Sequence, residues 1–89
     1  MQTTEVTISN KLGLHARAAA KLVSVASGYG AEITLDKAGQ KVNGKSIMGV
    51  MMLAASRGTV LTLTANGEGE DEVLRALVEL IDNKFGEGE

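Results

Sequence analysis

The sequence predicts an α+β protein: an open-faced β-sandwich in which a four-stranded antiparallel sheet is covered on one side by three helices. Two observations carry this prediction, namely apolar–polar alternation in four short segments and helical spacing of apolar residues in three others. Their order along the chain is β-α-β-β-α-β-α. A length of 89 residues leaves room for one hydrophobic core, so residues 1–89 are expected to form a single domain.

The four strands are predicted from alternation with period two. Val6 and Ile8 alternate with polar residues in segment 5–9, and Leu61 and Leu63 alternate with threonines in segment 59–65. Segment 31–36 alternates in the same way, and the turn "KAG" leads from it into a short strand at 40–43. The outward positions are mainly Thr, Glu and Ser, which is typical of an antiparallel sheet with one solvated face.

The three helices are predicted at 16–27, from Ile47 to about residue 54, and after the acidic segment "NGEGEDE". Gly28 is expected to end the first helix as a left-handed cap, and Ser46 to be the N-cap of the second. In the third helix we expect acidic residues in the first turn and Lys84 in the last, which favours the helix dipole. Its apolar stripe consists of Val73, Leu74, Leu77, Leu80 and Ile81. The tail, residues 86–89, is expected to fray.

Composition excludes several classes of function. The chain has no cysteine and one histidine, so we expect no disulfide, no metal site and no cofactor. A net charge of −2 and only two aromatic residues argue against a nucleic-acid partner. No apolar run approaches the roughly 20 residues that cross a bilayer, and the N-terminus does not resemble a secretory signal. We therefore expect no membrane insertion and a cytoplasmic location.

One short motif suggests a nucleotide hydrolase. The segment "GQKVNGKS", residues 39–46, satisfies the phosphate-loop pattern G-x-x-x-x-G-K-[ST]. However, only 43 residues follow Ser46, and no later strand ends in an aspartate that could help to hold Mg²⁺. The middle of the motif also fits a hairpin strand better, so we interpret the match as accidental.

His15 is the strongest candidate for chemistry. It precedes the first predicted helix, where unpaired backbone N–H groups and the helix dipole favour an anion and an uncharged imidazole. A neutral imidazole is a usable nucleophile, and the planar guanidinium of Arg17 suits phosphate oxygens. The residues therefore indicate a site that accepts a phosphoryl group on a ring nitrogen. The alternative is a binding module in which His15 is an inert capping residue.

Two longer segments resemble one known family. "GLHARAAAKLV" and "KVNGKSIMGVMMLAASRGTVLTLTANGEGEDE" are similar to the two signatures of the HPr family, the histidine phosphocarriers of the bacterial phosphoenolpyruvate-dependent sugar phosphotransferase system. The similarity spans nearly the whole chain. It implies a carrier without turnover of its own, phosphorylated on Nδ1 of His15, with Arg17 beside the phosphate. One departure is that the family usually reads H-x-R-P where this chain has Ala18. We expect the helix and the transfer to persist.

The resemblance also implies partners: the first enzyme of the pathway, which charges His15, and IIA domains, which receive the phosphoryl group. Ser46 in "KSIMGVM" resembles the regulatory serine on which an HPr kinase/phosphorylase acts. A phosphate there would weaken docking electrostatically. The nitrogen-regulatory branch of the family, with the same chemistry and different partners, is the alternative. We expect a monomer.

A docking surface is predicted around the histidine. Polarizable methionines suit a surface that meets several partners in turn. We expect an apolar patch surrounded by cations, with Met52 and Leu53 packing inward. The predicted docking residues are Leu14, Lys21, Lys45, Ile47, Met48 and Met51, with Arg17 beside them.

Overall fold

The computed structural model, which describes residues 1–88, is an open-faced β-sandwich with the predicted order of elements. The strands are β1 (Gln2–Thr7), β2 (Glu32–Lys37), β3 (Gln40–Asn43) and β4 (Val60–Asn66). The helices are α1 (Ala16–Ser27), α2 (Ile47–Met52) and α3 (Glu70–Asp82), followed by the 3₁₀ turn η1 (Lys84–Gly86). Among residues 1–88, no helix has the length and apolar character that spanning a bilayer requires.

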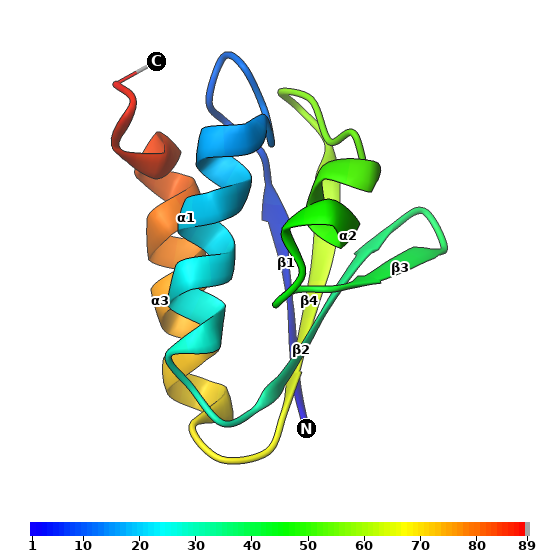
Figure 1. Cartoon of the computed structure of the whole chain (residues 1–89), viewed down its shortest axis with the longest axis vertical. Coiled ribbons are helices and arrows are strands. Elements are labelled where there is room, and N and C mark those ends of the chain that lie inside the picture. Colours follow the sequence, from blue (N-terminus) through cyan, green and yellow to red (C-terminus); the bar gives the residue numbers. More distant parts are fainter. Residues whose placement is uncertain (89) are drawn as a thin grey trace.

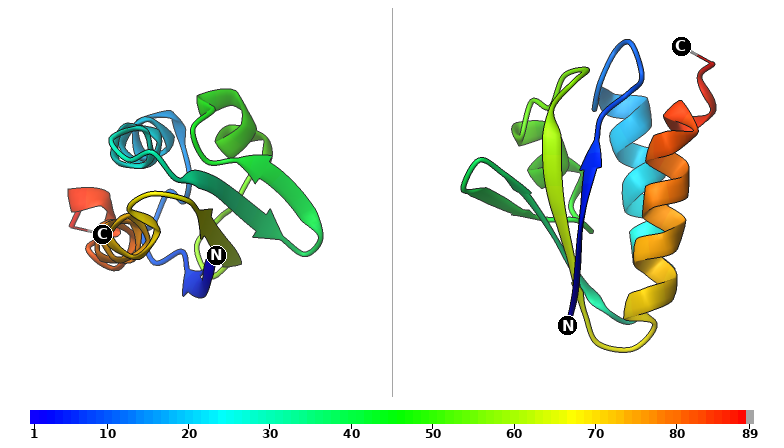
Figure 2. Two further views of the ribbon diagram at one scale, coloured as in Figure 1. Left: turned by 90° about the horizontal axis from the view of Figure 1, so that it is seen from below. Right: turned by 180° about the vertical axis from the view of Figure 1, so that it is seen from behind.

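The sheet has the strand order β1-β4-β2-β3, and every neighbouring pair is antiparallel. Helices α1 and α3 run along one face of the sheet in opposite directions, while the other face is left open (Figures 1 and 2). Because α1 begins where α3 ends, the start of α1 and the C-terminal tail lie at the same end of the molecule (Figure 1). That end carries His15.

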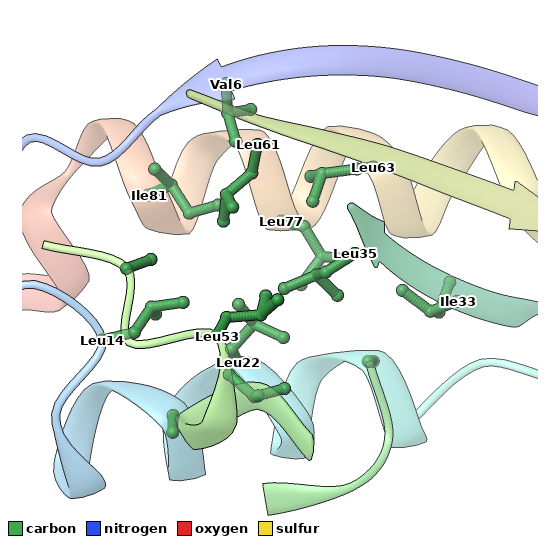
Figure 3. Packing of buried hydrophobic residues seen from close by; sticks show 14 of the residues in the cluster. Val6, Leu14, Leu22, Ile33, Leu35, Leu53, Leu61, Leu63, Leu77 and Ile81 are labelled. Carbon is green, nitrogen blue, oxygen red and sulfur yellow. The ribbon is translucent and has the colours of Figure 1, made fainter. Parts of the chain in front are cut away.

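The core lies between the sheet and the helices, and alternation places it there. Leu61 and Leu63 of β4 and Leu35 of β2 are fully buried, while their neighbours along each strand face outward. From the helices, Leu22 and Leu77 point into the same cluster (Figure 3). Burying each leucine side chain contributes about 2 kcal/mol, so this interior holds the sheet and helices in one arrangement.

The end of α1 differs from the prediction. Gly28 adopts φ −75°, which is a right-handed conformation, and its N–H donates to Val25 O at 3.1 Å. The following amide, Tyr29 N, donates to Ala26 O at 3.3 Å. The helix thus closes with i−3 bonds of the 3₁₀ type instead of a left-handed cap, so the prediction for Gly28 was wrong.

The end of α3 also differs from the prediction. The helix ends at Asp82, and Lys84 lies beyond it with φ 54°, so Lys84 is not in the last helical turn. Phe85 also has a positive φ, of 55°. The left-handed backbone at these two residues interrupts the helix, and the Phe85 ring lies in the core, where it is 1% exposed. Burial of the ring offsets the cost of the left-handed backbone.

Smaller differences concern boundaries and one side chain. The first strand is β1 at Gln2–Thr7 instead of 5–9, and Ile8 is buried just after it. Leu53 is buried as expected, but Met52 is 68% exposed, because Val50 is the buried residue of α2. The phosphate-loop motif forms β3 and the turns on either side of it, and a Cβ at Gly44, directly after β3, would lie 2.6 Å from Ile33 Cγ2. Gly44 is therefore explained by close packing on β2.

Candidate functional site

His15 is the N-cap residue of α1. Its backbone is extended, and its ring Nδ1 accepts a hydrogen bond from Arg17 N at 3.3 Å. The first i−4 bond of the helix runs from Ala19 N to His15 O, so the amides of residues 16–18 precede the helical ladder. Nδ1 is therefore the ring nitrogen that faces the positive end of the helix, where an anion is stabilised.

The loop before α1 is held in one conformation by the backbone. Leu14 N donates to Ala55 O at 2.9 Å, and Gly13 has φ +69°. A Cβ on Gly13 would lie 2.4 Å from Ala55 O, so only glycine allows this close approach. Asn10, which is fully buried, donates from Nδ2 to Gly13 O at 2.9 Å. The imidazole is thus presented by a loop that is fixed on both sides.

The ring also has a partner at its other nitrogen. Nε2 lies 2.5 Å from Oε2 of Glu87, and the second carboxylate oxygen, Oε1, accepts from Asn10 Nδ2 at 3.0 Å. The hydrogen bonds from Asn10 and His15 lower the pKa of the Glu87 carboxyl below its ordinary range, so this group is charged at neutral pH. The His15 side chain is 29% exposed, so it is held without being closed off from a partner.

A shallow pocket of about 380 Å³ surrounds the imidazole. Three segments line it: the loop before α1, the first turns of α1 and the C-terminal tail, which contribute Lys11, Leu12, His15, Arg17, Lys21, Gly86 and Glu87. Three cations and one carboxylate therefore surround the histidine. The described part of the chain holds no group of three His, Asp or Glu side chains that could bind a metal ion.

The structure brings His15 and Arg17 together as the sequence predicted, and Lys21 lines the same pocket. Lys21 has a further contact that was not predicted, because its Nζ donates to Phe85 O at 2.6 Å. It therefore anchors η1 against α1. Among the predicted docking residues, Ile47, Met48 and Met51 are 45%, 75% and 42% exposed and form an apolar surface on α2.

Two predicted docking residues lie elsewhere. Leu14 is 5% exposed and belongs to the core, so it is not a surface residue (Figure 3). Lys45 donates from Nζ to Tyr29 O at 2.7 Å, beyond the C-terminal end of α1 and hence at the opposite end of that helix from His15. It lines a separate hollow of about 520 Å³ over β2 and β3. Lys45 is bound by a carbonyl group, so it does not surround the histidine.

Ser46 is the N-cap of α2 as predicted. Its Oγ accepts from Gly49 N at 3.1 Å, and Asn43 supports the turn by accepting from Lys45 N at 2.9 Å. The hydroxyl thus has a structural role of its own.

Sequence analysis missed Asn10, Glu87 and Phe85. A signal existed for Phe85, which is one of only two aromatic residues and follows directly after an amphipathic helix. No local pattern pointed to Asn10 or Glu87, because they meet across 77 positions of the chain.

A histidine that caps a helix start beside an arginine, on an open-faced antiparallel sandwich, is an arrangement suited to a small phosphocarrier domain. Similarity to known protein families and structures agrees with this class. The family described as "PTS HPr component phosphorylation site" matches residues 2–83. The chain belongs to this HPr family, the phosphocarriers of the phosphotransferase system, which are carriers and not catalysts.

Individual relatives are similar along the whole chain. The phosphocarrier protein HPr of Pseudomonas aeruginosa is 59% identical over 90 residues, with full coverage of both chains. The phosphocarrier protein NPr of Shewanella violacea is 46% identical over 83 residues, which cover 93% of this chain and 91% of that one. Proteins named HPr and a protein named NPr are therefore both among the relatives.

Solved structures share the fold. The crystal structure of HPr-C-His from Thermoanaerobacter tengcongensis superposes with a TM-score of 0.95 at 49% identity, covering 98% of each chain. The Bacillus subtilis protein Crh, whose structure is described as a domain-swapped dimer, superposes with a TM-score of 0.76 at 44% identity. The match covers 94% of this chain and 97% of the Crh chain. The predicted open-faced sandwich is thus confirmed.

Proposed function

We propose that this protein carries a phosphoryl group on Nδ1 of His15, between the phosphoenolpyruvate-charged first enzyme of the phosphotransferase system and a IIA domain that serves sugar uptake. The observation that carries the proposal is the orientation of the imidazole. Nδ1 lies at the start of α1, where it accepts from Arg17 N, while Nε2 is bound to Glu87. A phosphoryl group on Nδ1 would meet N–H donors, whereas one on Nε2 would meet a carboxylate.

The residues around the ring support brief storage of the cargo. Arg17, in the same pocket, offers the guanidinium that pairs with phosphate oxygens, and Lys11 adds positive charge. No general base is aimed at an attacking water from within this set, since the one carboxylate is bound to Asn10 and His15. Such a site holds a phosphoryl group without hydrolysing it quickly.

Phosphoryl uptake from the charged first enzyme tests this function directly. The protein is incubated with phosphoenolpyruvate and that enzyme, and the modified residue is mapped by mass spectrometry. We expect one acid-labile, base-stable phosphate on His15 and none on His15→Gln. Uptake that survives in His15→Gln, or no uptake in the wild type, would leave the inert binding module as the better interpretation.

The sugar branch is proposed over the nitrogen-regulatory branch because "KSIMGVM" resembles the segment that carries the regulatory serine. Ile47, Met48 and Met51 of α2 supply the apolar part of the docking surface in this proposal, and Lys21 the charged part. We expect the carrier to act as a cytoplasmic monomer. Reconstitution with the first enzyme of each branch separates the two, since the proposal requires faster charging by the sugar enzyme.

We also propose that Ser46 is a regulatory phosphorylation site for an HPr kinase/phosphorylase. The hydroxyl lies at the start of α2, directly before the exposed Ile47 and Met48, so a phosphate of about −2 charge would border the docking surface. Ser46→Asp should slow charging of His15 without unfolding the protein. A charging rate equal to that of the wild type would argue against electrostatic control.

A further inference from the structure

The carboxylate of Glu87 has both oxygens engaged, and only one of its partners belongs to the structural core. Oε1 accepts from the buried Asn10 at 3.0 Å, and Oε2 lies 2.5 Å from Nε2 of His15. The Glu87 side chain is 15% exposed, although it lies in a C-terminal tail. It also lies outside residues 2–83, the part of the chain that matches the family. The family match therefore covers the His15 side of this contact and not the Glu87 side.

The tail is anchored so that the carboxylate reaches the ring. Phe85 is 1% exposed with φ 55°, and its carbonyl accepts from Lys21 Nζ at 2.6 Å. Gly86 N donates to Asn83 O at 2.9 Å, and Glu87 N donates to Lys84 O at 2.9 Å. A buried ring, a lysine and two turn bonds thus fix the backbone directly before and at Glu87.

We propose that Glu87 is a positioning residue for phosphoryl transfer: its carboxylate keeps the imidazole proton on Nε2, so that Nδ1 presents its lone pair at the start of α1. This inference rests on the proposed function and deepens it. A neutral imidazole carries its proton on one nitrogen only, and the hydrogen bond made by one nitrogen determines the state of the other. The Arg17 amide donates to Nδ1, which requires the same tautomer.

The transfer step then needs no proton movement. The Nδ1 lone pair of His15 forms a bond to phosphorus as the bond between phosphorus and the donor's leaving atom breaks, and the electron pair of that bond stays with the donor. The proton stays on Nε2, so the phosphorylated ring is cationic and is paired with the Glu87 carboxylate. When the phosphoryl group passes to the acceptor, the bonding electrons return to the ring and restore the neutral Nε2–H form. A cationic ring is the better leaving group, so the same carboxylate assists release.

The charged groups that face the ring come from three segments. Arg17 and Lys21 belong to α1, Lys11 to the preceding loop and Glu87 to the tail. The three cations disfavour a cationic ring, and Glu87 is the only carboxylate among the residues that line the pocket. Removing Glu87 should therefore remove the preference for a proton on Nε2, and no other residue that lines the pocket can replace its carboxylate.

Imidazole ¹⁵N NMR measures the tautomer without any partner protein. We expect the wild type to be mainly Nε2–H when the ring is neutral. In Glu87→Ala the Nδ1–H share should rise by roughly threefold, with Glu87→Gln intermediate because its amide oxygen still accepts. Glu79→Ala, on an exposed face of α3, is the matched control and should not differ from the wild type. Equal tautomer ratios in the wild type and in Glu87→Ala would overturn the proposal.

The phosphorylated form supplies a second readout that does not use the pathway enzymes. Phosphoramidate, a chemical phosphoryl donor, loads His15, and hydrolysis is followed against pH. Without the carboxylate the loaded ring loses its Nε2 proton at lower pH, so at mildly alkaline pH Glu87→Ala should hydrolyse roughly threefold more slowly than the wild type. A superimposable pH profile for the two proteins would also overturn the proposal. Failure of charging by the first enzyme would count against the proposed function alone, since both measurements here bypass that enzyme.

Discussion

The starts of α1 and α2 are capped in the same way and differ in what surrounds the cap. At α1 the imidazole of His15 accepts from Arg17 N, and at α2 the hydroxyl of Ser46 accepts from Gly49 N. The His15 cap is backed by a 12-residue helix that buries four residues, whereas α2 has six residues and buries only Val50. Both caps satisfy the backbone, so capping alone does not distinguish a reactive site from a structural one.

The two caps differ in whether the capping side chain has a second polar atom that binds another residue. The imidazole has a nitrogen left over, which Glu87 binds, and it shares a pocket with Arg17. Ser46 is instead preceded by the turn between β3 and α2, and exposed methionines follow it in α2. A cap becomes a candidate for group transfer when its remaining atom is also controlled, and this requires residues from distant parts of the chain.

Glycine substitutions near the two caps should give the largest contrast. Gly13→Ala places a Cβ 2.4 Å from Ala55 O at a positive φ, and we expect it to lower the free energy of unfolding by about 3 kcal/mol. A Cβ at Gly49 would make only ordinary contacts, with Ser46 at 3.4 Å and Asn43 O at 3.5 Å, so Gly49→Ala should change stability by less than about 1 kcal/mol. Urea unfolding of both variants measures the difference. Equal losses would mean that the loop before α1 is not rigidly fixed.

Arg17→Ala should affect the reactive cap without affecting the fold. Arg17 is exposed, and alanine has a high helix propensity, so stability should stay within about 0.5 kcal/mol of the wild type. Phosphoryl uptake on His15 should fall about tenfold, because a charge-assisted contact to the phosphate is lost. Arg75→Ala, an exposed arginine on α3, is the control and should charge normally. If both variants charged alike, Arg17 would have no particular role.

Ser46→Ala addresses the structural cap in isolation. Loss of the Oγ acceptor leaves Gly49 N without its cap, which should cost about 1 kcal/mol in thermal or urea unfolding. Charging of His15 should remain within about twofold of the wild type, since α1 and its pocket are untouched. A large drop in charging would show that the start of α2 contributes directly to docking through this hydroxyl.

The parts that could be predicted from the sequence depend on neighbouring residues. Alternation in β4, the helical spacing in α3 and the serine before Ile47 each follow from residues a few positions apart. The parts that were missed depend on contacts between residues that are far apart in the sequence. Glu87 reaches His15 only because Lys84 and Phe85 adopt left-handed backbone conformations, and neither residue is of a type that favours a positive φ. Met52 was placed inward because periodicity cannot fix the rotation of a helix this short.

Of these changes, lowering the pH should alter stability least. Near His15 it should act through protonation of Glu87. Its hydrogen bonds to Asn10 and His15 lower the pKa of Glu87, and the terminal amino group of Met1 and Gly67 N lower the pKa of Glu70. A lowered pKa in the folded state means that the unfolded chain binds protons first as the pH falls. Each carboxylate therefore contributes stability above the ordinary glutamate pKa, and this contribution disappears as the pH falls through the lowered value.

The protonation of Glu87 and that of Glu70 can be distinguished by which NMR signals shift as the pH falls. In NMR titrations of the acid range, the Asn10 side-chain amide should shift with protonation of Glu87. The Gly49 amide should not, because it donates to the Ser46 hydroxyl, which does not titrate in this range. Glu87→Gln should abolish the Asn10 shift, and Glu70→Gln, which affects the opposite end of the molecule, should leave it intact. If the Asn10 shift persisted in Glu87→Gln, protonation of Glu87 would not be its cause. The hydrogen bond from Asn10 to Glu87 would then not make the His15 cap sensitive to pH, and the two caps would differ only through Arg17.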